Sequence, residues 1–136
     1  MNFLEIFNDI TEQILPVILK YRQDISSLGI ELKEDKSIVT KADFDVQKLI
    51  MDVVLKYDSS ANFIAEENNY VRQNNFDSRY TWIIDPIDGT SQFINPNSKE
   101  YCTVELIISV EEEVIINDFT DTFDMCDLEK ELIYQF

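Results

Sequence analysis

Two acidic residues at the end of an apolar segment are the first candidates for chemistry. Asp85 directly follows the segment 80–84, and Asp88 comes three residues later. Pro86 fixes the backbone and favours an extended conformation before it, so we expect the Asp85 carboxylate at a strand end. Both carboxylates can then reach one cation, and the backbone carbonyl of Ile87 offers a further oxygen. The segment therefore predicts a metal site built from oxygen ligands.

The residues after these acids can bind an anion. Gly89, Thr90 and Ser91 supply backbone amides and two hydroxyls just before an expected helical turn at 92–94. Amides at the start of a helix donate hydrogen bonds to phosphate. The chain has only two glycines, whereas average usage near ~7% predicts about ten. Retention of Gly89 therefore indicates a positive φ or a close approach of backbone.

Oxygen ligands beside a phosphate-binding loop are typical of metal-assisted phosphoester hydrolysis. Hard oxygen ligands suit Mg²⁺ better than zinc. In such a site one ion activates water and another stabilises the leaving oxygen. Glu66 ends another short apolar segment, and it is the candidate acceptor for the proton of the water.

Each of these residues also has a simpler interpretation. The segment 85–90 is rich in turn formers and can be a tight turn. Glu66 and Glu67 can form a solvated strand end, whereas Asp43 and Ser91 can cap helices. The residues alone leave both interpretations open.

The composition excludes several classes of function. The chain has 136 residues with 27 acidic and 11 basic side chains, a net charge of −16 and no histidine. This charge disfavours nucleic acid and anionic membranes as partners, and the lack of histidine excludes imidazole-dependent catalysis. The chain also lacks a signal-peptide pattern and an apolar run of the ~18 residues that a membrane helix needs. We expect a cytoplasmic protein.

The elements that position these residues are two helices followed by strands. Apolar residues recur at helical spacing over 3–25, where Pro16 should kink or split the helix. A second helix is predicted over 41–57, with Thr40 as N-cap and Asp43 as its capping-box partner.

Short apolar and alternating segments predict the strands. They lie at 62–65, 80–84 and 102–110, with a solvated excursion at 68–78 and a hairpin at 111–116. Cys102 falls on the apolar face of its strand and is expected in the core. The order of elements predicts an α+β fold in which two long helices pack on an antiparallel sheet.

Three motifs, in order, resemble the inositol monophosphatase superfamily of Mg²⁺-dependent, lithium-sensitive phosphatases. The segment 82–90 with Ser91-Gln92-Phe93 matches the long first signature of that family, Trp-Ile-Ile-Asp-Pro-Ile-Asp-Gly-Thr, almost letter for letter. The segments 63–67 and 37–43 resemble its Gly/Ser-Glu-Glu strand end and its Pro-Val-Thr-x-Ala-Asp helix entry.

The resemblance implies the metal ligands. Glu66 would bind a first Mg²⁺ and help orient the attacking water. Asp85 and the carbonyl of Ile87 would bind metal as well, and Asp88 would bridge toward a second ion. Asp43 would support an outer ion or its waters. Two or three ions bind in the family, and fewer are expected here.

The resemblance also implies the phosphate site. Gly89 and Thr90 would hold phosphate together with Asp88 and Ser91, and the Thr90 hydroxyl would also contact the water. Glu67 adjoins a metal ligand and would have a supporting role.

Short similarities indicate the branch of the family. The pattern Lys33-x-Asp35-x-Ser37 and the segment 100–104 look more like 3'(2'),5'-bisphosphate nucleotidases than inositol phosphatases. The expected activity is therefore hydrolysis of a phosphomonoester on a small nucleotide. An inositol-1-monophosphatase is one alternative, and a non-catalytic metal- or phosphate-binding remnant is another.

The resemblance runs from about Phe3 to Ile116. We therefore expect an N-terminal α+β phosphatase domain over residues 1–116, which is the N-terminal half of the layered sugar-phosphatase fold. The acidic segment 117–136 resembles nothing in the family, and the second family domain has no counterpart. We expect a truncated chain, produced by a frameshift or an early stop, with doubtful activity on its own. Its bare interdomain face should be apolar and should associate with another copy or fragment.

Overall fold

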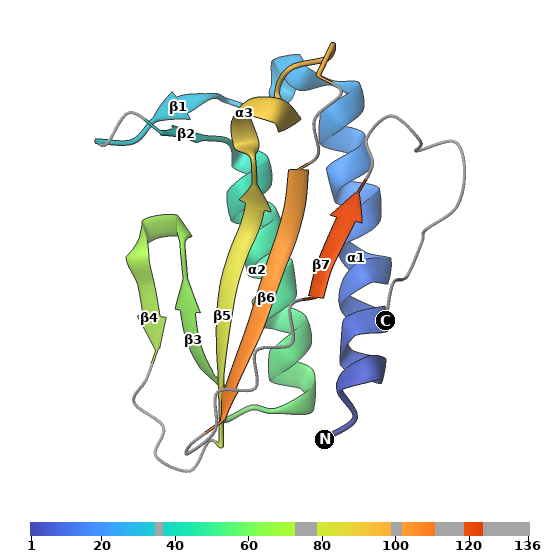
Figure 1. Cartoon of the computed structure of the whole chain (residues 1–136), viewed down its shortest axis with the longest axis vertical. Coiled ribbons are helices and arrows are strands. Elements are labelled where there is room, and N and C mark those ends of the chain that lie inside the picture. The colour runs from blue at the N-terminus through green and yellow to red at the C-terminus, as the bar shows by residue number, and fades with distance from the viewer. Residues whose placement is uncertain (35–36, 73–78, 99–101, 111–118, 124–136) are drawn as a thin grey trace.

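Two helices lie against one face of a twisted sheet in the computed structural model (Figure 1). The structure describes residues 1–34, 37–72, 79–98, 102–110 and 119–123. The helices are α1 (Phe3–Gln23), α2 (Lys41–Tyr57) and the short α3 (Thr90–Phe93), with 3₁₀ turns at Ile25–Ser27 and Glu67–Asn69. The sheet contains, in spatial order, β4 (Tyr70–Arg72), β3 (Asn62–Ala65), β5 (Tyr80–Asp88), β6 (Cys102–Val110) and β7 (Phe119–Phe123). A separate ribbon pairs β1 (Glu31–Leu32) with β2 (Ile38–Val39).

The first helix passes through its proline without a break. α1 is one element over Phe3–Gln23, so the split expected at Pro16 is not observed. Proline removes the hydrogen bond to the carbonyl four residues earlier, which here belongs to Glu12. Both residues lie on the exposed side of α1, where water can satisfy that carbonyl.

The second helix has the predicted bounds and the predicted cap. α2 spans Lys41–Tyr57, and the Thr40 side chain accepts a hydrogen bond from the Ala42 amide while Asp43 binds back to the Thr40 amide. This reciprocal arrangement is a capping box, which satisfies amides that lack a partner in the first turn.

The α+β class is confirmed, and the sheet is mixed rather than wholly antiparallel. β3 and β5 run parallel, whereas the other paired strands are antiparallel. The reason is β4, which lies in the segment expected to be a solvated excursion. It reverses the chain beside β3, so that β5 can add to the other edge of β3 in the direction of β3.

The strand that carries the signature is longer than predicted. β5 continues past Ile84 to Asp88, and its register with β6 shifts between the pairs Asp85–Glu105 and Asp88–Thr103. Three steps along β5 therefore match two along β6. This irregularity is a bulge, which bends a strand and redirects its side chains.

The end of the chain is only partly described. The hairpin predicted at 111–116 lies outside the described residues. β7 (Phe119–Phe123) pairs antiparallel with β6, so part of the segment 117–136 belongs to the sheet.

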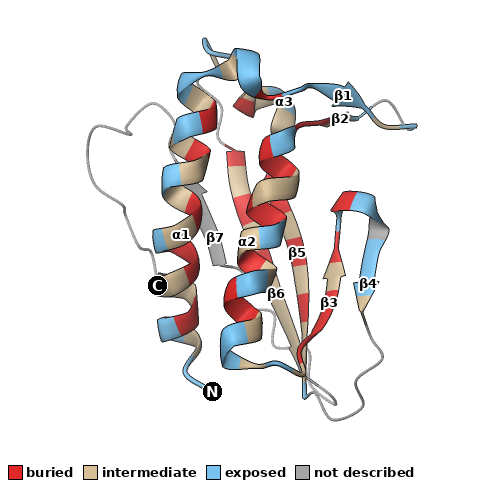
Figure 2. Cartoon of the chain, turned by 180° about the vertical axis from the view of Figure 1, so that it is seen from behind, coloured by how far each residue is buried: buried red, intermediate tan, exposed pale blue. Residues whose placement is uncertain are grey.

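The core lies between the sheet and the helices (Figure 2). The strands contribute Phe63, Ala65, Trp82, Ile84, Cys102, Val104 and Leu106 to it, and the helices contribute Ile6, Ile10, Ile14, Ile18, Val46, Ile50, Val53 and Val54. Cys102 is buried there, as predicted. Within the described residues, no helix is long and apolar enough to cross a membrane.

The other face of the sheet carries an apolar row. Val71, Ile64, Ile83 and Ile107 are register partners across β4, β3, β5 and β6, so their side chains share one face. They line a hollow of about 340 Å³ whose rim includes Asp85 and other acidic side chains. Glu66, Asp85 and Glu105 thus line the same hollow as the apolar row.

Candidate metal and phosphate site

The ends of two neighbouring strands bring the first pair of acids together. Because β3 runs parallel to β5, Ala65 is the register partner of Ile84. The amide of Glu66 donates to the Ile84 carbonyl over 3.0 Å. Glu66 and Asp85, the next residues along these parallel strands, therefore lie side by side. The signal in the sequence was that each acid directly follows a short apolar segment.

The carboxyl group of Asp85 lies in an unfavourable place for an anion. Burial is the largest cause that raises its pKa, and together with the charge and hydrogen bond of Glu66 and the charges of Asp88 and Glu105 it brings the pKa to about 7. One of its oxygens, Oδ1, is buried and has no hydrogen-bond partner within the described residues. A cation would relieve both problems because it attracts the charged form and uses the free oxygen.

The acids do not yet surround a common point. Within the described part of the chain, no group of three acidic or cysteine side chains has the geometry to hold a metal ion. Asp88 is exposed, and its Oδ2 accepts from the Thr103 hydroxyl at 3.5 Å. The structure thus pairs Glu66 with Asp85, and Asp88 acts on that pair through its charge.

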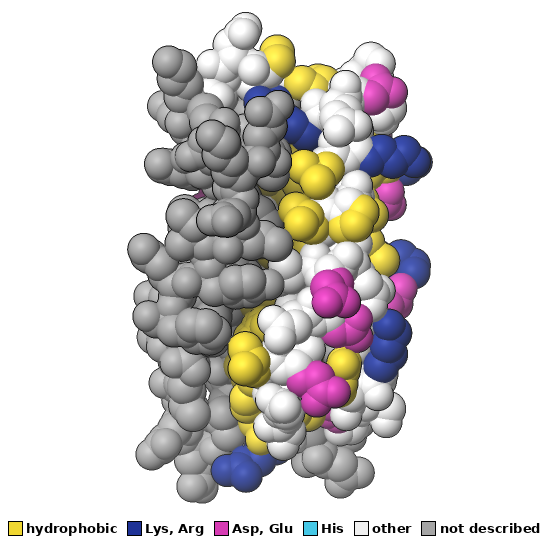
Figure 3. Space-filling model, turned by 90° about the vertical axis from the view of Figure 1, so that its right-hand side faces the viewer, with side chains coloured by type: hydrophobic (Ala, Val, Ile, Leu, Met, Phe, Trp, Pro, Cys, Tyr) yellow, Lys and Arg dark blue, Asp and Glu magenta, His cyan; other side chains and the backbone are white. Residues whose placement is uncertain are grey.

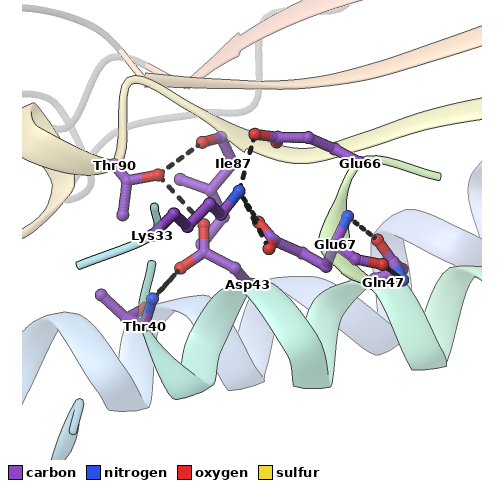
Figure 4. A network of polar contacts seen from close by, with 8 residues as sticks. All are labelled: Lys33, Thr40, Asp43, Gln47, Glu66, Glu67, Ile87 and Thr90. Atoms are coloured by element: carbon purple, nitrogen blue, oxygen red, sulfur yellow. Dashed lines mark hydrogen bonds and ion pairs between the residues drawn. The ribbon is translucent and has the colours of Figure 1, made fainter. Parts of the chain in front are cut away.

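Lys33, which was not predicted as a site residue, forms an ion pair with Glu66, the neighbour of Asp85. The ammonium of Lys33 lies 2.9 Å from Glu66 Oε1 and 3.0 Å from Glu67 Oε2 (Figure 4). Lys33 belongs to the motif that indicated the branch of the family, and that motif was the available signal. Its partners lie 33 and 34 residues away in the chain, so no local pattern reveals the contact.

Glu67 points inward, although a solvated strand end was the simpler interpretation for it. The residue is 1% exposed. Its amide donates to Gln47 Oε1 at 2.9 Å, and its carbonyl accepts from Gln47 Nε2 at 3.2 Å. Burial raises the pKa of its carboxyl, while the hydrogen bond and charge of Lys33 act in the opposite direction. Glu67 is therefore a fixed, buried acid beside the exposed Glu66.

Asp43 joins the helix cap to the loop that starts at Gly89. It is fully buried, and its Oδ2 accepts from the Thr40 amide at 2.7 Å and from the Thr40 hydroxyl at 2.6 Å. Its Oδ1 lies 3.1 Å from the Thr90 hydroxyl, which also lies 3.0 Å from the Ile87 carbonyl (Figure 4). One hydroxyl proton serves one of these acceptors at a time. Burial raises the pKa of Asp43, and the hydrogen bonds from Thr40 and Thr90 lower it.

The glycine in the signature has the expected backbone conformation. Gly89 has φ 88° and ψ 40° and forms the N-cap of α3, so its positive φ is confirmed. α3 starts at Thr90, two residues earlier than predicted. Ser91 is thus inside the first turn and does not cap it, and its exposed hydroxyl donates to Gln92 Oε1 at 2.7 Å.

An arginine from the first helix fixes the far end of this loop. The guanidinium of Arg22 donates to the Phe93 carbonyl at 2.8 Å and to the Asn95 carbonyl at 2.9 Å. These contacts span 71 and 73 residues of sequence, and no sequence pattern indicated them. Together, Asp43 and Arg22 hold both ends of the loop that starts at Gly89.

The α+β layer, with acidic strand ends beside a turn that contains Gly89, has the elements that the three sequence motifs predicted. The model of the Inositol monophosphatase family matches residues 2–117. The chain therefore belongs to the inositol monophosphatase family, which is a family of phosphatases.

Curated relatives from two branches match this chain. It is 29% identical over 114 residues to an inositol monophosphatase of Dictyostelium discoideum, covering 84% of this chain and 41% of the relative. It is 32% identical over 108 residues to the 3'(2'),5'-bisphosphate nucleotidase CysQ of Haemophilus influenzae, covering 72% and 38%. The chain thus spans about two fifths of the length of these relatives.

Solved structures show the same fold. An IMPase of Thermotoga maritima matches with a TM-score of 0.65 and 27% identity, covering 84% of this chain and 42% of that one. The extragenic suppressor protein suhB of Bartonella henselae matches with a TM-score of 0.73 and 19% identity, covering 90% and 52%.

Proposed function

We propose that this chain carries the metal- and phosphate-binding half of an Mg²⁺-dependent phosphomonoesterase. The observation that carries the proposal is the crowded pair of Glu66 and Asp85, with a buried Asp85 oxygen that has no partner within the described residues. Oxygen ligands of this kind fit Mg²⁺. A loop with a positive-φ glycine and the hydroxyls of Thr90 and Ser91 follows directly on the same strand.

The acids would hold the ion. Glu66, Asp85 and the Ile87 carbonyl would bind a first Mg²⁺, and Asp88 would reach toward a second. Mg²⁺ bound there would neutralise phosphate charge and lower the pKa of a bound water. Glu66, the more exposed of the pair, would help orient that water. Glu67, buried behind Glu66, would support its position.

The loop would hold the phosphate. The amides of Gly89 and Thr90 and the hydroxyl of Ser91 would donate to its oxygens. Asp43 would orient the Thr90 hydroxyl, because its Oδ1 lies 3.1 Å from that group. The Thr90 proton would then point either at Asp43 or at the Ile87 carbonyl, which leaves its oxygen available as an acceptor for the water.

The proposed substrate is a small phosphorylated nucleotide of the 3'(2'),5'-bisphosphate type. The motif that contains Lys33 and the 32% identity to the CysQ nucleotidase support this choice. Inositol 1-phosphate is the alternative, supported by the 29% identity to an inositol monophosphatase. A solved neighbour with a TM-score of 0.62 is described as an IMPase/NADP phosphatase complexed with Mg²⁺ and phosphate.

A non-catalytic role that binds metal or phosphate is the second candidate. It is favoured by the lack of a preformed three-carboxylate group within the described residues. Turnover distinguishes it from the first candidate.

The test measures phosphate release by the purified chain from 3'-phosphoadenosine 5'-phosphate and from inositol 1-phosphate. Turnover should require Mg²⁺ and should fall about 100-fold or more in Asp85→Asn and Asp88→Asn. Asp52→Asn is the matched control, because Asp52 is an exposed acid on α2 paired with Lys48. Equal turnover in EDTA would refute the metal-dependent reaction, whereas Mg²⁺ binding without turnover would support the non-catalytic role.

A further inference from the structure

The side chain of Lys33 bridges two carboxylates of very different exposure. The side chain of Glu67 is 2% exposed and that of Glu66 is 46% exposed, with Lys33 between them at 26%. The backbone of Lys33 is also fixed, because its amide donates to the Ser37 carbonyl at 2.9 Å at the turn end of the β1–β2 ribbon. The lysine therefore reaches the site from an anchored position (Figure 4).

The two ion pairs differ in strength for a physical reason. A buried carboxylate that loses its cation is left charged in a poor solvent, so the Lys33–Glu67 pair is costly to break. An exposed pair exchanges its partner for water at little cost, so the Lys33–Glu66 pair is the weaker one. The ammonium of Lys33 thus forms a strong ion pair with Glu67 and a weak, labile ion pair with Glu66.

The labile contact is with the acid that the proposed function assigns to Mg²⁺. A carboxylate oxygen that accepts from an ammonium at 2.9 Å uses the charge and the lone pair that a metal ion needs. Because like charges repel, an ammonium that stays on Glu67 also weakens binding of a cation to Glu66.

We propose that Lys33 is a positioning residue that acts as an internal counter-ion, holding Glu66 and Glu67 in the metal-free protein and competing with the divalent cation for Glu66. When the cation binds, Lys33 stays with Glu67 and releases Glu66. This inference rests on the proposed metal site, and it makes the lysine a stabiliser of the metal-free protein and an opponent of metal binding.

Two measurements on one variant test the proposal, since stability should fall while Mg²⁺ affinity rises. Lys33→Met should lower the melting temperature in EDTA, because Glu67 loses its cation. The same variant should bind Mg²⁺ about two- to fivefold more tightly in a calorimetric titration, which is the scale of an exposed ion pair. Lys33→Arg should restore the melting temperature and the weaker Mg²⁺ affinity. Lys48→Met, which removes an exposed lysine paired with Asp52 on α2, should change neither quantity.

A second variant keeps the test decisive if Lys33→Met does not fold. The double variant Lys33→Met with Glu67→Gln removes the buried charge together with its partner, so it should fold and still bind Mg²⁺ more tightly. Unchanged or weaker Mg²⁺ binding in the variant that folds would overturn the proposal, because a merely structural ion pair predicts that result. Failure of every variant to bind Mg²⁺ would refute the proposed metal site itself. Mg²⁺ binding that appears only after Lys33 is removed would support the competition.

Discussion

At the scale of single residues, the site is a set of acids kept close together against their mutual repulsion. Asp85 carries the largest consequence, because burial and the neighbouring carboxylates raise its pKa to about 7. Between its ordinary value of 3.8 and that value, the folded protein binds a proton that the unfolded chain has lost. The free energy of unfolding must therefore fall as the pH rises through this range.

Replacing Asp85 should remove this pH dependence. In EDTA, Asp85→Asn should melt at a higher temperature than the wild type at pH 8, because the variant has no charge to bury. The difference should shrink toward pH 5, where the native carboxyl is already protonated. Circular dichroism melts of both proteins across this range measure the difference. A constant difference between the two proteins at every pH would contradict the raised pKa of Asp85.

The site residues that could be predicted from the sequence are marked by patterns among neighbouring residues. Asp85, Asp88 and Gly89 lie in one continuous signature, and the positive φ of Gly89 followed from the scarcity of glycine. Lys33 and Arg22 act on the same site from other elements. Their contacts depend on tertiary packing over more than 30 residues of sequence, which periodicity does not encode.

At the scale of elements, the helices followed from the sequence more closely than the sheet did. The bounds of α2 and its capping box were predicted, because helical spacing and capping are properties of neighbouring residues. The strand β4 was missed, because three polar-flanked residues carry no alternation that can be recognised. The bulge in β5 was missed as well, since a shift of register depends on the partner strand.

Through Arg22, α1 holds the far end of the loop that is proposed to bind phosphate. Arg22→Met should weaken inhibition of the chain by inorganic phosphate, or binding of phosphate in a calorimetric titration, by about three- to tenfold, because two hydrogen bonds to loop carbonyls are lost. Lys20→Met is the matched control, since Lys20 is an exposed basic residue in the same last turn of α1. Equal phosphate affinity in both variants would show that the loop holds its shape without Arg22.

At the scale of the whole molecule, an apolar sheet face favours self-association and a strongly negative net charge opposes it. The row of Ile64, Ile83 and Ile107 lines a hollow on the open face, while the net charge of −16 keeps copies apart. Figure 3 shows another flank, on which hydrophobic side chains reach the surface beside acidic ones and basic side chains are scattered.

This balance predicts self-association that grows with salt. Sedimentation equilibrium at low and at about physiological ionic strength should show a higher mean mass in the saltier buffer, because screening over ~8 Å weakens the repulsion while apolar contact persists. Ile107→Thr keeps a β-branched side chain and should reduce the association. Leu4→Thr, which changes an exposed leucine on α1, should leave it unchanged. A mean mass equal to one chain at both ionic strengths would contradict the prediction.

The carboxylate of Asp43 closes the start of α2 and touches the Thr90 hydroxyl with its other oxygen. An oxyanion that draws the Thr90 hydroxyl toward itself therefore removes a hydrogen bond from Asp43, the residue that caps the first turn of α2. Backbone protons in that turn should then exchange with deuterated solvent at a rate that depends on whether the anion is present. The helix would report on occupancy of the loop without itself touching the anion.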